Sequence, residues 1–313
     1  MKRFALILLS GGAVAVAAPA TALAAPPTVN TGGATNVAQT TATLNGSVNP
    51  RGNPTFSYFQ VGTTKAYGGQ TPEVDRGAGS TPVKTPVDLT GLAPFETYHY
   101  RIVAQFGERV VLGEDKTFRT ERQPLGLTLV SNPLQIRPNG STTISGTISG
   151  TGNGGREVIL QANPFPFSGF TDVGNPQIVD EAGNFAFPLL TVPFNTVYRV
   201  RVPSKPNLAS PEVPVNVKPS LSVKAPSTVR RGKKARFTGG LTPGNPGAQI
   251  TIQRNFKGQW ITVKRTKLGR SSKFSAGIRP FRDGNFRVVV TPDAKYVPDT
   301  SSTKRIDVKK NRR

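Results

Sequence analysis

Residues 92–104 read Leu-Ala-Pro-Phe-Glu-Thr-Tyr-His-Tyr-Arg-Ile-Val-Ala, and this stretch decides the fold. Its aromatic and apolar side chains alternate along the chain at Tyr98, Tyr100, Ile102 and Ala104. The positions between them hold His99, Arg101 and Val103. Because successive side chains of a strand point to opposite faces, we expect the first set to face a core and the second to face outward. The stretch therefore predicts a long β-strand that is entered through a Pro-containing turn.

The rest of the chain shows the same alternation in short segments. It has 313 residues with 33 Gly and 28 Pro, which cut it into short alternating runs, and no segment keeps a 3.6-residue apolar spacing. Three blocks follow, 28–120, 125–218 and 220–309, each of the size of a two-sheet sandwich. The predicted fold class is all-β: three tandem β-sandwiches after a signal peptide, with a basic tail at 310–313.

The first block resembles a fibronectin type III domain. Leu92, Pro94 and Tyr98 resemble the tyrosine corner of that family, and the resemblance implies that the Tyr98 hydroxyl bonds to a nearby backbone group. The following alternation also matches the family, and residues 117–120 would form its last strand.

The second and third blocks look like copies of one another. Val158-Ile159-Leu160-Gln161 matches Ile250-Thr251-Ile252-Gln253 at an offset of 92, and an aromatic-Arg-Val strand at 198–202 matches 286–290. Both blocks resemble the bacterial immunoglobulin-like repeats of surface and secreted proteins, which implies a sandwich fold for each of them.

The first residues predict export. Lys2 and Arg3 precede an apolar run that ends at Ala22-Leu23-Ala24, the three parts of a secretory signal peptide at 1–24. A permanent membrane anchor is the alternative, but the apolar part is short for one. Since no second long apolar run follows, we expect no transmembrane segment after cleavage and a secreted or envelope-associated protein.

Most catalytic chemistry has no candidate residues here. The chain has no Cys and one His, so thiolate catalysis and sulfur-based zinc sites are excluded. His99 stands beside Arg101 with no acidic partner suggested nearby, and Asp172 and Asp180-Glu181 lack the spacing of a calcium loop. We therefore predict no enzyme activity, no cofactor and no metal site.

The charge lies almost entirely in the last block. Residues 219–313 carry 23 Lys and Arg against 4 Asp and Glu, a net +19 of the total +23. The candidate polyanion-binding residues are Arg230, Arg231, Lys233, Lys234, Arg236, Lys264, Arg265, Lys267, Arg270, Lys309, Lys310, Arg312 and Arg313. They form either a solvated, self-repelling surface or a site for an anionic polymer such as wall phosphates, acidic glycans or lipid headgroups.

Four aromatic side chains offer a second kind of contact: Phe165, Phe167, Phe170 and Trp260. The three phenylalanines cover their own core or form a contact surface, and Trp260 is expected to pack across the sandwich. The function predicted is adhesion, spacing or scaffolding at a bacterial envelope, with an anionic polymer or another surface protein as partner. A carbohydrate-binding accessory module is the alternative, and no specific nucleic acid is expected.

Overall fold

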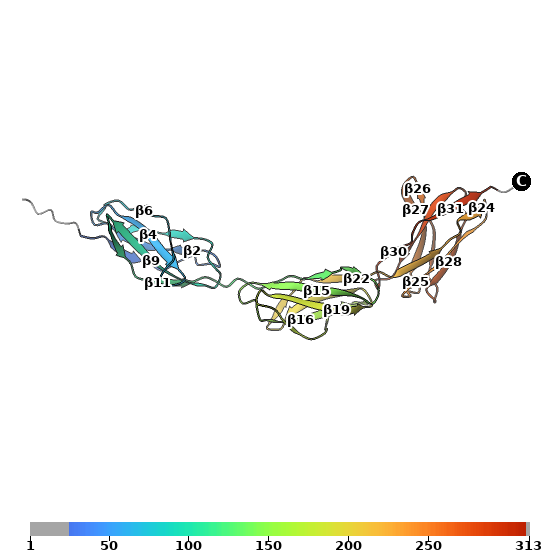
Figure 1. The fold of residues 1–313 in the computed structure, drawn as a ribbon, viewed down its shortest axis with the longest axis horizontal. Helices are drawn as coiled ribbons and strands as arrows, with labels where there is room; N and C mark the ends of the chain where they lie inside the picture. Colours follow the sequence, from blue (N-terminus) through green and yellow to red (C-terminus); the bar gives the residue numbers. More distant parts are fainter. Residues whose placement is uncertain (1–24, 311–313) are drawn as a thin grey trace, which may run out of the picture. The chain divides into compact units, whose positions relative to one another are not determined.

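The computed structural model describes residues 25–310, and all regular structure in that range is β-strand (Figure 1). The predicted signal peptide at 1–24 and the end of the tail, with Arg312 and Arg313, lie outside the described residues. In the described part of the chain no helix is long and apolar enough to cross a membrane. The protein is a chain of tandem β-sandwiches, with separate apolar clusters in the first, second and third modules.

The first module contains β1 (Thr28–Thr31), β2 (Ala42–Leu44), β3 (Gly46–Asn49), β4 (Phe56–Gly62), β5 (Gly69–Gln70), β6 (Val74–Asp75), β7 (Val83–Lys84), β8 (Val87–Leu89), β9 (Thr97–Phe106), β10 (Arg109–Leu112) and β11 (Lys116–Arg119). Strands β10, β9, β4 and β5 form the larger sheet, with β11 paired to β9 and β6 to β4. The order β1-β3-β7 and the pair β2-β8 make up its other sheets. Between them lie the fully buried side chains of Leu44, Phe59, Tyr100 and Ile102.

The second module contains β12 (Gly126–Leu127), β13 (Val130–Asn132), β14 (Gln135–Ile136), β15 (Gly140–Ser149), β16 (Glu157–Pro164), β17 (Thr171–Asp172), β18 (Gln177–Ile178), β19 (Asn184–Val192), β20 (Thr196–Val202), β21 (Lys205–Ala209) and β22 (Val213–Val217). The third contains β23 (Ser220–Lys224), β24 (Thr228–Arg230), β25 (Ala235–Thr242), β26 (Gln249–Phe256), β27 (Gln259–Lys267), β28 (Lys273–Ile278), β29 (Gly284–Thr291), β30 (Asp299–Thr300) and β31 (Lys304–Lys309).

These two modules share a feature that the described part of the first lacks. An early strand of each crosses to the second sheet and runs parallel to the last strand: β14 beside β22, and β24 beside β31. All strand pairings of the first module are antiparallel. The topology thus separates the first block from the other two, as the sequence patterns also do.

One long strand departs from the predicted alternation. Val103 of β9 was expected to face outward, yet its side chain is fully buried. Strand β9 is central in its sheet, and Val103 is flanked by Tyr58 of β4 and Leu112 of β10. Side chains at directly opposed positions lie about 5 Å apart, so the neighbours cover this outward position.

The second and third modules belong to one compact unit, residues 124–313. Tyr296, between β29 and β30, is 3 % exposed and belongs to the apolar cluster of the second module. Its ring lies 6.2 Å from that of Phe194, and Asn195 bonds through its backbone N–H to the Lys295 carbonyl at 3.0 Å. Lys218 pairs with Asp299 at 3.3 Å. The joint between these modules is therefore structured rather than a bare linker.

Candidate polyanion-binding surface

The three modules build the same polar contact on the outer face of their larger sheet. A Gln and an Arg stand directly opposite one another on neighbouring strands: Gln60 and Arg101, Gln161 and Arg199, Gln253 and Arg287. In each pair the Arg Nε donates to the Gln Oε1 at 2.8 Å. The equality of register and distance makes these positions equivalent in the three modules.

An aromatic ring completes each contact. The guanidinium carbon of Arg101 lies 4.6 Å from the centre of the Tyr67 ring, that of Arg199 4.1 Å from Phe170, and that of Arg287 4.3 Å from Trp260. Cations are attracted to ring faces at such distances. We name each set of Gln, Arg and aromatic residue the stacked trio of its module. The sequence analysis noted the repeated Gln and Arg in two blocks but missed their pairing.

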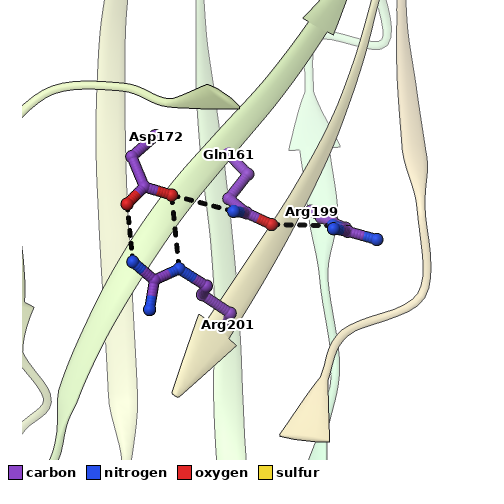
Figure 2. Close-up of polar contacts among 4 residues, drawn as sticks. All are labelled: Gln161, Asp172, Arg199 and Arg201. Atoms are coloured by element: carbon purple, nitrogen blue, oxygen red, sulfur yellow. Dashed lines mark hydrogen bonds and ion pairs between the residues drawn. The ribbon is translucent and has the colours of Figure 1, made fainter. Parts of the chain in front are cut away.

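The second module extends its trio into an ion pair (Figure 2). The Gln161 side-chain amide donates to Asp172 Oδ1 at 2.8 Å, and Arg201 donates to both Asp172 oxygens, from Nη2 at 2.5 Å and from Nε at 3.2 Å. The pKa of Asp172 is lowered below its ordinary value, mainly by the hydrogen bond from Arg201 and to a smaller extent by the one from Gln161. The network satisfies Asp172 with protein groups, so this carboxylate serves the module's own surface.

Trp260 lies elsewhere than predicted. It was expected to pack across the sandwich, but it stands opposite Asn255 on the outer face and does not belong to the apolar cluster of its module. On β26, the side chain that faces inward next to Asn255 is that of Arg254. Trp260 therefore packs beneath Arg287, where one ring face is taken by a guanidinium.

The three phenylalanines of the second module do not form a flat platform. Phe165 and Phe167 meet at an interplanar angle of 88°, and Phe170 lies beneath Arg199. None of the three belongs to the module's apolar cluster, so the loop does not cover the core. Stacking on a sugar ring needs an exposed ring face, and the most exposed of these three rings, Phe167, is only 39 % exposed.

His99 does have an acidic partner, contrary to the sequence analysis. Its Nδ1 lies 2.8 Å from Asp115 Oδ2, and the Tyr67 hydroxyl donates to Asp115 Oδ1 at 2.9 Å. Asp115 is 16 residues away and directly precedes β11, which pairs with β9 and so places Asp115 beside His99. Burial raises the pKa of Asp115, but the bonds from His99 and Tyr67 outweigh it and the net pKa is lowered. The contact adds to the first module's trio and includes no nucleophile.

The Tyr98 hydroxyl bonds to the turn that precedes its strand. It accepts a hydrogen bond from the Ala93 backbone N–H at 2.8 Å, between Leu92 and Pro94. The Tyr98 ring stacks on Phe118 with 5.5 Å between centres. This hydroxyl fastens the turn to β9.

The first basic cluster meets the C-terminal strand. Arg230 is the register partner of Lys309 in the parallel pair of β24 and β31, and the Arg231 backbone N–H donates to the Lys309 carbonyl at 2.9 Å. The exposed side chains gathered near this end are Arg230, Arg231, Lys233, Lys309 and Lys310. Arg236 is also exposed, on the next strand, where it alternates with the buried Phe237.

The second basic cluster is divided between two faces of one sheet. Arg265 and Lys267 stand opposite Thr251 and Gln249, on the outer face. Lys264 stands opposite the buried Ile252, so it lies on the inner face of the sheet, at the edge of the sandwich. Arg270 is exposed in the turn between β27 and β28. The predicted cations among residues 25–310 therefore do not form one patch.

Few of these charges are neutralised within the protein. Among residues 25–310, the ion pairs that involve the third module are Lys218 with Asp299 and Arg305 with Asp307. None of the predicted polyanion-binding side chains in that range takes part in either pair. Their positive charge is available to an external anion.

Sequence comparison finds no matching family model and no matching curated protein. Among solved structures, the chain is similar to a tetra-tandem repeat from the extending region of a large adhesion protein (TM-score 0.36, 15 % identity, 90 % of this chain and 74 % of that one). It is also similar to the FN1–FN3 domains of chicken CNTN1, with a TM-score of 0.27 and 16 % identity over 90 % of this chain and 99 % of that one. A third similar structure is the Yersinia pseudotuberculosis adhesin InvE, with a TM-score of 0.29 and 12 % identity over 57 % of this chain and 58 % of that one. Likenesses at this level identify neither a family nor a ligand for this chain.

Proposed function

We propose that this protein is an exported, non-enzymatic spacer or adhesion protein of a bacterial envelope. A fibronectin type III-like module and one immunoglobulin-like repeat precede a second immunoglobulin-like repeat, and this third module binds an anionic polymer. The observation that carries the proposal is the net charge of +19 on residues 219–313, almost none of which is paired within the described residues. The partner is an anionic polymer of the cell wall or surface.

Charge alone makes a specific prediction about this binding. Many weak contacts to a dense polyanion add up, and the release of its counterions makes affinity fall steeply as salt rises. The first two modules carry a net charge of +1 each, so they contribute little attraction of this kind. The third module should therefore determine both the affinity and its salt dependence.

The test compares two fourfold variants of the full chain on purified cell wall and on a sulfated-glycan resin. One variant replaces Arg230, Lys233, Arg265 and Lys267 by Gln. The matched control replaces Lys65, Lys84, Arg109 and Lys205, which are exposed cations of the first two modules. We expect the first variant to elute at clearly lower salt and the control to elute close to wild type. Equal elution of the two variants, or elution that ignores salt, would reject the proposal.

Sugar stacking is less well supported as an alternative function. The two neighbouring phenylalanine rings are nearly perpendicular, and Phe170 and Trp260 are each stacked against an Arg of their own module. A flat, exposed aromatic platform is not present among these four residues.

A further inference from the structure

An Arg takes a core-facing position in the third module. Counting from the Gln of each stacked trio, the next residue points inward: Val61 in the first module, Ala162 in the second and Arg254 in the third. Each stands opposite an aromatic residue of the neighbouring strand, and for Arg254 this is Phe286. An inward-facing charged side chain requires a partner, because an unpaired buried polar group costs free energy.

The structure gives Arg254 only part of its partners. Its Nη2 donates to the Asp283 carbonyl at 3.1 Å, but its Nε is buried and has no hydrogen-bond partner among the described residues. The Asp283 carboxylate accepts a hydrogen bond from the Val308 backbone N–H at 2.6 Å. The protein therefore satisfies this guanidinium only in part, at the edge of the sandwich.

The Arg254 side chain lines a half-open groove of about 370 Å³. Three other cations line it, Lys234, Lys264 and Arg279, and no carboxylate does. The groove lies where β27 of one sheet and β28 of the other leave the sandwich edge open, with Ile278 and Phe286 at its base. It unites one residue of each predicted basic cluster with two cations that the sequence analysis did not single out.

Two further features suit this groove to a ligand. Gly284 leaves room for the guanidinium, since a Cβ at that position would lie 2.9 Å from Arg254 Nε. The equivalent positions hold Tyr98 in the first module and Thr196 in the second, three residues before the Arg of each trio. At the rim, Phe281 is 68 % exposed, an unusual state for a large apolar ring.

We propose that this groove binds a tetrahedral oxyanion, a phosphate or sulfate group, carried on a sugar ring of the anionic polymer. The four cations surround the oxyanion, the Arg254 guanidinium donates to one of its oxygens, and Phe281 contacts the ring that bears it. Charge-assisted bonds of a planar guanidinium suit phosphate and sulfate geometry. This proposal rests on the proposed function, because it supplies the defined site within the broader electrostatic attraction.

The test measures binding of the full chain by calorimetry to two probes, a sulfated tetrasaccharide and a sugar phosphate, with inorganic phosphate and an uncharged tetrasaccharide beside them. Lys264→Gln and Arg265→Gln form a matched pair, since they remove the same charge from adjacent residues on opposite faces. We expect Lys264→Gln, and likewise Arg279→Gln, to weaken binding at least fivefold, and Arg265→Gln less than twofold.

Two further variants test the groove without a change in the net charge of the chain. Gly284→Ala should displace Arg254 and weaken binding at least fivefold, while Phe281→Ser should weaken the two sugar probes but not inorganic phosphate. Phe256→Ser, at an exposed ring outside the groove, is the control and should have no effect. Circular dichroism and melting temperature show whether each variant folds.

The outcomes separate the two proposals. If the chain binds the probes but Lys264→Gln and Arg265→Gln weaken binding equally, and Gly284→Ala has no effect, the groove is not a site and general attraction remains. If wild type binds inorganic phosphate as tightly as the sugar probes, the sugar-bearing ligand is wrong. A wild-type chain that binds neither probe and no polyanion at low salt overturns both proposals.

Discussion

The second and third modules share the stacked trio but surround it with different residues. In the second, the stacked trio continues into Asp172 and Arg201, so its polar face is satisfied internally. In the third, Thr262 stands opposite the trio's Gln where Asp172 stands in the second, and Val289 follows the trio's Arg where Arg201 does. The ion pair is thus absent at the equivalent register positions, although the trio itself is kept.

The difference shows that the sandwich with its stacked trio and the charge of its surface depend on different residues. The trio depends on opposed positions of two central strands, and it recurs even in the first module, whose topology differs. Apart from Arg236 on β25, the predicted cations among the described residues lie on edge strands, in turns and on the last strand, where substitutions do not disturb the core. A sandwich can therefore acquire a polycationic surface without a change of fold.

Tyr296→Ala should have the largest effect, because it tests whether the two modules are one structural unit. Removing a large buried side chain typically costs a few kcal/mol, so we expect a loss of about 2–4 kcal/mol in the stability of the second module, whose cluster Tyr296 joins. Hydrogen exchange resolved by module is the measurement. Phe256→Ala, which truncates an exposed ring, is the control. Faster exchange confined to the third module would show that the joint does not couple the two.

The fold could be predicted from the sequence to a large extent, because period-two alternation and turn residues are local. The alternation at 98–104 and the copied strands at 158–161 and 250–253 correspond to β9, β16 and β26. What failed was the part that depends on strand neighbours. Val103 is covered because β9 is central, and His99 meets Asp115 through the pairing of β11 with β9.

The candidate site was less accessible to sequence reasoning. Basic clusters are visible as runs, but the groove cations Arg254 and Arg279 stand alone in the sequence and gather only when two sheets pack. One signal was present: the third module holds Arg254 where the copied strand of the second holds Ala162. A charged residue at an inward position of a repeat marks a departure from the shared core.

Tyr98→Phe sharpens the comparison with the first module, where Tyr98 replaces the Thr196 and Gly284 of the others. The variant removes one hydrogen bond to the Ala93 backbone and leaves the ring stack on Phe118 in place. We expect a loss of about 0.5–1.5 kcal/mol in the stability of the first module. Denaturant melts of the full chain with module-resolved exchange measure it, and unchanged stability would show that the hydroxyl does not hold the turn.

Gln161→Ala and Gln253→Ala compare the two trios directly. Both variants remove a bond to the opposed Arg, and Gln161→Ala also removes the donor to Asp172. Each bond contributes roughly 1 kcal/mol or less at such part-exposed positions, so both losses should be small and that of Gln161→Ala the larger. Equal losses would mean that the ion pair of the second module is independent of its trio.

Asp172→Asn should have the smallest effect, and this effect should depend on pH. The bond from Arg201 lowers the folded-state pKa of Asp172, so the carboxylate stabilises the fold above its unfolded pKa, and this contribution is lost as pH falls through the folded value. Because Asp172 is 46 % exposed, solvent screening keeps the gain below about 1 kcal/mol. At neutral pH the variant should be slightly less stable than wild type, and the two should converge in acid. Glu212→Gln, at an exposed carboxylate of the same module, is the control. Denaturant midpoints across the acidic range measure the difference, and a gap that persists at low pH would show that Arg201 does not act through the charge of Asp172.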